Sequence, residues 1–567
     1  MINKLTKTNN KLGFLSCLIM TFLTTTVMAA EDNRPNILLI VADDLGYSDV
    51  GAFGSEIQTP NIDSLAKHGV KLTNFHGAPT CSPTRSMLLS GIDSHQVGLG
   101  NMAELIQPEQ KGKPGYEGYL NESVATLPEV LSSNGYNTYM VGKWHLGRTE
   151  DKSPAGRGFD KSFALMQGGA SHYDDQRAII AKDPKALYRD NGKSVDLPKG
   201  FYSTDNYTDL IIKYIDEDMA EKKPFFAYVA YTAPHWPLHA PDAYIKKYKG
   251  RYDEGYEKIR STRLKLMKEM GIIDPLVSVN APLSQLPHWD ELTDEQRKIE
   301  ARRMEVYAAM VDNMDHNIGR LLAWLKEEGE LDNTVIMFMS DNGADGNSPE
   351  VLPGNKAWFA SDYDNSFDNM GRKNSYIWYG AQWGQVGATP FPLFKGFTSQ
   401  GGIVIPAIIN YPQKFPQGSV NHSLLTVKDI MPTFLELANI TPPKSPYNGR
   451  KILSMQGRSI SPALNGEKTK ERVIGWELFG RSAIRKGDWK IRLLEQPYGS
   501  GKWALFNLKD DPTEITDLAV KQPGKLAELL KDWEEYVTIN GVIPSDPQKM
   551  KKIGYSFTTC VFEHCVE

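Results

Sequence analysis

Three long apolar runs constrain the fold of this chain more than any other feature of its sequence. They are Asn36–Ala42, Pro224–Tyr231 and Thr334–Met339, and none of them alternates apolar with polar residues. A run without alternation is typical of a parallel strand buried on both faces. Helical patterns lie between the runs, including one that starts with a capping box at Thr126 and Glu129. We therefore predict an α/β fold with a large mixed, mostly parallel sheet sandwiched by helices.

The pattern changes after about Thr441. Short strands separated by turn sequences indicate an antiparallel sheet over residues 473–479, 482–485, 489–494 and 503–508. Residues 522–537 form one amphipathic helix in this interpretation, packed on that sheet. Because 567 residues exceed the size at which one core usually stops growing, we predict two domains. The predicted parts are a signal peptide at 1–29, a large α/β domain at 33–440 and a smaller C-terminal α+β domain at 441–567.

The first thirty residues predict export. Three lysines precede an apolar stretch from Leu12 to Met28, and cleavage is expected after Ala29 or Ala30. A retained membrane anchor is the weaker alternative because serine and threonine interrupt the stretch. No other segment is long and apolar enough to cross a bilayer. We expect an exported protein, periplasmic or secreted, without stable membrane insertion.

Charge and cysteine content narrow the function further. The 64 basic and 69 acidic side chains give a net charge of -5, which argues against a nucleic-acid partner and makes any anion site local. Once the signal is removed, Cys81, Cys560 and Cys565 remain. The last two can close a small loop in an oxidising compartment. Cys81 is then left alone, which suggests a reactive or modified side chain.

The segment Cys81–Gly91 is typical of a helix N-terminus. Proline is tolerated in the first turn, so the helix is expected to begin at Ser82 or Pro83 and to end at Gly91. Cys81 then lies at the positive end of the helix dipole, and Arg85 adds a full charge one turn later. Both favour an anion beside residue 81. Taken alone, the pattern also fits a buried cysteine that caps an ordinary helix.

Oxygen-bearing side chains follow two of the apolar runs. Asp43 and Asp44 follow the first run, and Asp341 and Asn342 follow the third. The carboxyl ends of parallel strands are where open α/β sheets build their ligand sites. Hard oxygen donors suit calcium, and these residue types do not exclude magnesium. Zinc is disfavoured because histidine and thiolate ligands are scarce in these segments.

Cationic and imidazole side chains follow other predicted strands. Lys143 and His145 come after a strand at 136–141, and in a strand extension they would face the same side. His235 lies between two prolines that restrict its backbone. Lys395 lies at a further strand approach. Each of them alone also fits a surface loop or a packed side chain.

Taken together, these segments resemble the sulfatase family. Residues 81–85, Cys-Ser-Pro-Thr-Arg, match its Cys-x-Pro-Ser/Thr-Arg pattern, although Ser90 stands where threonine is frequent. The likeness covers nearly the whole chain and points to secreted bacterial arylsulfatases, with residues 374–376 and 398–403 adding to it. The resemblance implies that a formylglycine-generating maturation enzyme oxidises Cys81 to formylglycine (3-oxoalanine). It also implies one calcium ion per chain, bound by Asp43, Asp44, Cys81, Asp341 and Asn342.

The same resemblance implies hydrolysis of a sulfate monoester, an aryl sulfate in preference to a glycan sulfate. Arg85, Lys143, His235 and Lys395 would bind the substrate. Our hypothesis is that Asp341 activates one hydroxyl of the formylglycine hydrate and that His235, helped by Lys395, protonates or stabilises the departing oxygen. His145 would then draw a proton from the second hydroxyl, so that sulfate leaves without a second attack at sulfur.

Two other functions are compatible with the sequence. A phosphonate monoester hydrolase or phosphodiesterase of the same superfamily would share the fold and the metal site. A binder of sulfated polysaccharide would keep the cleft without turnover. We place substrate specificity in residues 151–199, in an insertion at 244–292 and in a long loop at 358–387. We also expect a monomer.

Overall fold

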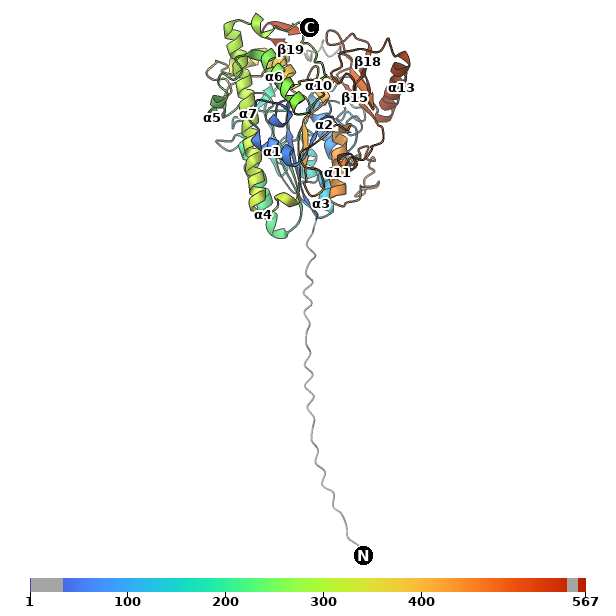
Figure 1. Ribbon diagram of the computed structural model, residues 1–567. Coiled ribbons are helices and arrows are strands. Elements are labelled where there is room, and N and C mark those ends of the chain that lie inside the picture. Colours follow the sequence, from blue (N-terminus) through green and yellow to red (C-terminus); the bar gives the residue numbers. More distant parts are fainter. Residues whose placement is uncertain (2–33, 548–558, 567) are drawn as a thin grey trace. The chain divides into compact units, whose positions relative to one another are not determined.

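A ten-stranded sheet forms the centre of the computed structural model (Figure 1), which describes Met1, residues 34–547 and residues 559–566. The predicted signal peptide therefore lies outside the described residues. The strand order is β13-β2-β12-β11-β1-β10-β4-β5-β8-β9. In that order the bounds are Ser419–Asn421, Val70–Leu72, Ala407–Asn410, Thr334–Ser340, Asn36–Ala42, Phe225–Ala230, Asn137–Lys143, Lys161–Leu165, Tyr188–Asp190 and Lys193–Val195.

The five central strands β11, β1, β10, β4 and β5 run parallel, whereas β12 and β8 join their flanks antiparallel. The prediction of a mixed, mostly parallel sheet is confirmed. Ile40 of β1 lies opposite Val229 of β10 and Phe338 of β11. This aligned register brings the carboxyl ends of the central strands to one edge of the sheet.

Successive residues of β1 pack into two different cores because side chains alternate between the faces of a strand. Leu38, Ile40 and Ala42 belong to the core beneath α1 (Pro60–His68), α4 (Ser203–Asp218) and α7 (Asp294–Glu327). Ile37, Leu39 and Val41 belong to the core beneath α2 (Cys81–Ser90), α3 (Leu127–Ser133) and α11 (Ile430–Leu437). Figure 1 shows these helix groups on opposite sides of the sheet. Burial on both faces explains why the run lacks polar residues.

The predicted C-terminal antiparallel sheet is present. It consists of β15 (Val473–Leu478), β16 (Arg481–Lys486), β17 (Trp489–Leu493) and β18 (Trp503–Asn507), in that order. Helix α13 (Pro523–Asn540) packs on it through Leu529 and Tyr536, which share a small core with Ile484 and Ile491. The domain boundary near residue 440 stays a prediction.

Helices occupy parts of two predicted specificity segments, so the prediction of a loop at 358–387 was wrong. The insertion at 244–292 begins within α5 (Asp242–Lys247) and contains α6 (Gly255–Glu269), with Gly250 at positive φ in the turn between these helices. The predicted loop at 358–387 contains the end of α8 (Asn355–Asp362) and all of α9 (Gly380–Gly387). Helix α9 is glycine-rich and fully buried, so packing outweighs its poor intrinsic propensity. Further along the chain, α10 (Gln400–Ile403) precedes β12, which begins at Ala407.

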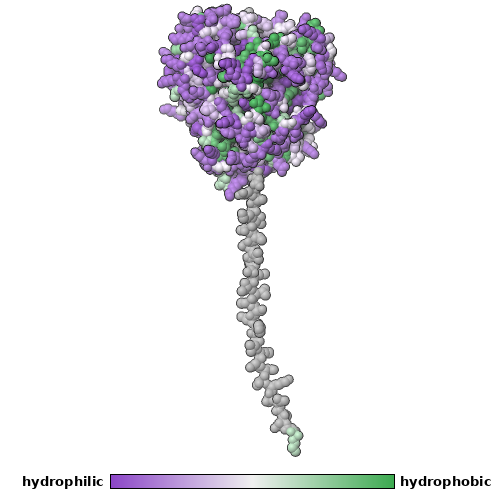
Figure 2. Space-filling view, in the orientation of Figure 1, coloured by the Kyte–Doolittle hydropathy of each residue, from purple (hydrophilic) through white to green (hydrophobic). Residues whose placement is uncertain are grey.

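The remaining elements are short. Strand β3 (Phe75–His76) pairs with β14 (Leu425–Thr426), and β6 (Arg177–Ile180) pairs with β7 (Asp183–Lys185). A C-terminal hairpin of β19 (Thr559–Val561) and β20 (His564–Val566) contains the Cys560–Cys565 disulfide. Helix α12 (Ser461–Leu464) is also short. Within the described residues, no helix has the length and apolar character needed to cross a membrane. The face in Figure 2 is mostly hydrophilic, with smaller hydrophobic areas.

Candidate active site

The carboxyl edge of the central sheet holds most of the predicted site residues. Asp43 follows β1, Asp341 follows β11 and Lys143 ends β4. Asp43 N donates to the carbonyl of Ala233 in the loop after β10, and Asp341 N donates to the carbonyl of Ala42. These bonds hold the strand extensions together beyond the sheet. Local sequence thus determines which side chains emerge at the edge, and the strand order determines which of them meet.

Four acidic or thiol groups form a cluster at this edge. One ligand atom each of Asp43, Asp44, Cys81 and Asp341 lies within 4.8 Å of the others, and all four residues are buried. Burial raises the pKa of Asp43 to about 8; Lys143 opposes this, while Asp341 and Asp44 add to it. Carboxylates packed this closely are stabilised by a cation between them.

Asn342 completes a donor set for such a cation. Its Nδ2 donates to Asp44 Oδ1 at 2.7 Å. Its Oδ1 is buried and has no hydrogen-bond partner in the described part of the chain. An unpaired buried carbonyl is costly, and a metal ion would satisfy it. Carboxylate and amide oxygens are the donors that calcium and magnesium take, so these residues fit such an ion.

Cys81 is the first residue of α2, one position earlier than the predicted start, and Gly91 ends the helix at φ 69° as expected. Its Sγ lies 4.0 Å from Asp44 Oδ1. Burial raises the pKa of the thiol well above its ordinary range, and Lys143 and Lys395 only partly offset this. The sequence had suggested that the helix end favours an anion at residue 81, but desolvation outweighs that effect for an unmodified thiol.

Three cations surround the cluster, each held by carboxylates. Arg85 places Nε and Nη2 at 2.9 and 2.8 Å from Asp341 Oδ2. Lys143 Nζ lies 2.8 Å from Asp43 Oδ2, and burial, which alone lowers the pKa of Lys143, is outweighed by that carboxylate. Lys395 Nζ is 2.8 Å from Asp44 Oδ2. Positive charge thus adjoins both the acidic cluster and residue 81.

The two histidines are oriented by different partners. His235 Nδ1 bonds to the carbonyl of Trp236, and its Nε2 lies 3.4 Å from Asp44 Oδ2. Burial, together with Lys395 and Lys143, lowers the pKa of His235 well below its usual range. His145 Nε2 lies 2.9 Å from Glu104 Oε1. The predicted strand extension at His145 was wrong, because β4 ends at Lys143 and His145 has a φ of 55°.

Sequence reasoning missed two site residues. Asp345 accepts hydrogen bonds from Lys395 Nζ at 3.0 Å and from Trp236 Nε1 at 2.8 Å, so it fixes both side chains. It lies in the same polar segment as Asp341, and that proximity was an available signal. Glu104 lies in a short 3-10 turn, residues 103–105, and nothing in its surroundings marked it.

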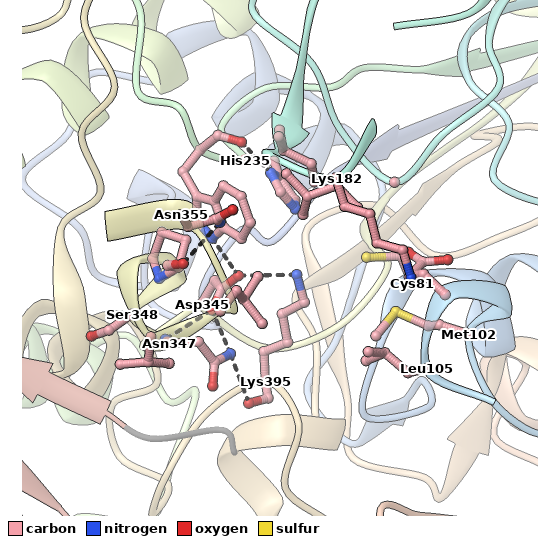
Figure 3. A pocket seen from close by; sticks show the side chains of 18 of the residues that line it. Cys81, Met102, Leu105, Lys182, His235, Asp345, Asn347, Ser348, Asn355 and Lys395 are labelled. Carbon is pink, nitrogen blue, oxygen red and sulfur yellow. Dashed lines mark hydrogen bonds and ion pairs between the residues drawn. The ribbon is translucent and has the colours of Figure 1, made fainter. Parts of the chain in front are cut away.

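One pocket opens on Cys81, His145, His235 and Lys395, and Figure 3 shows part of this wall. Its cavity of about 160 Å³ is comparable to an engineered cavity of about 150 Å³ that binds benzene. Of the three predicted specificity segments, 151–199 contributes to the lining, whereas no described residue of 244–292 or 358–387 does. The apolar lining residues are Met102, Leu105, Ile179, Ile180, Trp236, Pro349, Val351, Leu352 and Pro353.

The C-terminal sheet supports loops that carry site residues. Trp476 Nε1 donates to Gly77 O at 2.9 Å, ahead of the helix that begins at Cys81. Arg481 Nη1 donates to the carbonyl of Gly396, next to Lys395, at 2.7 Å. Lys490 Nζ donates to Thr398 O at 2.7 Å. The small sheet therefore helps to hold the backbone on both sides of the pocket.

Comparison with known proteins identifies relatives along most of the chain. A sequence model of the sulfatase family matches residues 35–440, and one described as N-sulphoglucosamine sulphohydrolase, C-terminal, matches residues 393–537. An uncharacterized sulfatase of Schizosaccharomyces pombe is 46% identical over 531 residues, covering 91% of this chain and 95% of the relative. An arylsulfatase of Klebsiella aerogenes is 40% identical over 452 residues, covering 78% and 95%.

Among solved structures, the crystal structure of Ps i-CgsB superposes with a TM-score of 0.63 at 26% identity, covering 92% of this chain and 97% of that one. The same protein has been solved in complex with k-i-k-neocarrahexaose. The superposition agrees with the large mixed sheet and the smaller C-terminal sheet described above.

Proposed function

Because the chain belongs to the sulfatase family, whose model matches it over residues 35–440, we propose that it hydrolyses aryl sulfate monoesters at Cys81. The observation that carries the proposal is the buried convergence of three carboxylates and three cations around that one residue. In the proposed enzyme Cys81 is oxidised to formylglycine, which supplies a hydrated aldehyde with one hydroxyl to attack sulfur and a second that allows sulfate to leave.

Calcium is proposed as the metal, held by Asp43, Asp44, Asp341, Asn342 and residue 81. The unpaired Oδ1 of Asn342 and the packed carboxylates support a hard dication there. When bound, the ion would supply positive charge that lowers the pKa of a nearby hydroxyl.

The cations are assigned to the sulfate. Arg85 and Lys143 lie next to the cluster and would bind sulfate oxygens and the charge that develops on them in the transition state. His235 and Lys395 flank Asp44 and would stabilise or protonate the oxygen of the departing phenol. Asp341 is assigned as the base because its carboxylate is ionised beside residue 81: burial raises its pKa, but Arg85, Lys143 and Lys395 outweigh burial and lower the pKa to about 2.

His145 is assigned to the second proton transfer. A carboxylate only accepts hydrogen bonds, so Glu104 fixes the proton of His145 on Nε2 and leaves Nδ1 as the acceptor. That Nδ1 is buried and has no partner among the described residues. A free acceptor nitrogen is what this step requires.

The pocket walls support an aryl leaving group. They are mainly aliphatic, with one tryptophan, and the cavity has the volume of a small arene site. A sugar ring would bury hydroxyls against these aliphatic side chains, so the apolar part of the lining favours an arene. The Klebsiella aerogenes relative is an arylsulfatase, which agrees with this choice.

Mass spectrometry of the tryptic peptide carrying residue 81, combined with a sulfate-release assay on phenyl sulfate, tests the proposal. We expect formylglycine in the peptide and turnover in the wild type, and no turnover in C81A with an unchanged near-UV circular dichroism spectrum. Retained activity in C81A would refute the nucleophile. Faster hydrolysis of an aryl phosphonate or a phosphodiester than of phenyl sulfate would assign the chain to the related phosphorus chemistry instead.

A further inference from the structure

Lys182 is a cation at the pocket that the mechanism above does not use. It lines the same cavity as Cys81, and its side chain is exposed. Figure 3 shows it extending from the β6–β7 hairpin across the side of the pocket where His235 and Cys81 lie. Among the residues that the structure describes, no carboxylate or carbonyl pairs with its ammonium group. Its charge is therefore available to a bound molecule.

The backbone beneath Lys182 is held in place by a buried side chain. Ala181 N donates to Asn355 Oδ1 at 3.0 Å, and Asn355 Nδ2 donates to Pro349 O at 3.0 Å. Asn355 is 1% exposed and also lines the pocket. Two residues earlier, in β6, the carbonyl of Ile179 accepts a hydrogen bond from Tyr376 Oη at 2.9 Å. The hairpin turn is thus docked against the opposite wall, and the lysine is attached to a fixed support.

Neighbouring charges already have partners. Asp183, the next residue, pairs with Arg148 at 2.6 Å, and Lys185 of the same hairpin pairs with Asp196 at 3.1 Å. The pocket acids are engaged as well, since Glu104 bonds to His145 and Asp345 bonds to Lys395. Within the described residues, Lys182 is consequently the lining cation without an acidic partner.

We propose that Lys182 binds a second anionic group, a carboxylate or sulfonate, on the aromatic ring of the substrate. This inference rests on the proposed function and deepens it: the substrate is an aryl sulfate that also bears an acid. The ring lies against the apolar wall, the ester sulfate reaches residue 81, and the acid meets the ammonium at the rim. A charge beside low-dielectric walls interacts more strongly than one in open water.

The test compares phenyl sulfate with 4-carboxyphenyl sulfate in the wild type, K182A and K185A. For K182A we expect KM for the carboxylated substrate to rise about fivefold, the upper range for a solvent-accessible ion pair, with KM for phenyl sulfate within twofold of the wild type. K185A is the matched control, because Lys185 lies on the same hairpin, pairs with Asp196 and does not line the pocket. The effect should shrink at high salt.

A second measurement separates this inference from the proposed function. Calorimetric binding of 4-hydroxybenzoate and of phenol requires no turnover, and K182A should weaken only the former. If the wild type releases no sulfate but this difference persists, the proposed function fails and the anion site stands. The role of Lys182 would be overturned if K182A changed the affinity for both ligands and the KM for both substrates equally, or changed none of them. A preference of the wild type for a disulfated glycan that K182A leaves unaltered would overturn it as well.

Discussion

His95 links the loop after α2 to the C-terminal sheet, and its protonation should make stability depend on pH. It is 3% exposed, with Nδ1 2.8 Å from Asp93 Oδ1 and Nε2 3.7 Å from Glu477 Oε2 on β15. Lys428 and Tyr536 also face Asp93, at 3.5 and 3.0 Å. Burial alone lowers the pKa of His95, but the two carboxylates outweigh it and raise the pKa from 6.5 to about 9.

A folded-state pKa above the unfolded one means that the folded protein holds the proton more tightly. The resulting stability is fully present below pH 6.5 and is lost as the pH rises through about 9. A difference of about 2.5 pH units corresponds to about 3 kcal/mol of unfolding free energy, at 1.36 kcal/mol per unit. Because His95 is buried, solvent screening reduces this contribution to the unfolding free energy only slightly.

The assay is urea unfolding, followed by tryptophan fluorescence, at several pH values from 6 to 9.5 with calcium held constant. Between pH 6 and pH 9.5, the unfolding free energy of the wild type should fall by about 3 kcal/mol more than that of H95Q. H288Q is the matched control: His288 Nδ1 also lies 2.9 Å from a carboxylate, that of Glu257, but the side chain is 53% exposed. H288Q should keep the wild-type pH dependence. Identical slopes for the wild type and H95Q would show that His95 is not protonated in the fold.

Two further predictions concern the site. Replacing Asn342 with leucine removes the unpaired amide oxygen and should weaken calcium binding at least about tenfold, as measured by calcium-dependent thermal shift; unchanged calcium affinity would remove Asn342 from the ligand set. E104Q should lower kcat about 10- to 100-fold with little change in KM, because glutamine no longer fixes the proton on His145 Nε2, and E104D should recover part of the rate. A pure rise in KM for E104Q would contradict this positioning role.

The strand-end residues were predictable because each follows an uninterrupted apolar run. Asp43 and Asp341 emerge from β1 and β11, which pair in parallel register, so the spacing of the runs and the rule for parallel sheets place them together. Lys395 was different. The sequence placed it at the approach to a strand, but it precedes α10 instead, so its position in the site did not follow from the strand-end rule.

Other features depend on contacts that leave no local pattern. Glu104 contacts His145 from a short turn that is distant in sequence. His145 has a left-handed backbone, so its side chain does not take the direction that a strand extension would give it. Helix α9 forms in a glycine-rich segment because it is buried on all sides. The periodicity of apolar residues indicates which face of a helix or strand is buried. It does not indicate which distant segment packs against that face, and that packing determines the Glu104–His145 contact and helix α9.

The hydrogen bonds from Trp476, Arg481 and Lys490 to the main chain at Gly77, Gly396 and Thr398 limit how far this catalyst can be shortened. A minimal enzyme cut after residue 440 would keep the acidic cluster but lose the bracing of the loops that carry Cys81 and Lys395. An engineer seeking a smaller version would have to rebuild those three attachments elsewhere. For the same reason, exchanging the C-terminal segment for that of a relative would shift the loops that carry Cys81 and Lys395. The geometry of the active site would then change although no residue in contact with the substrate had been replaced.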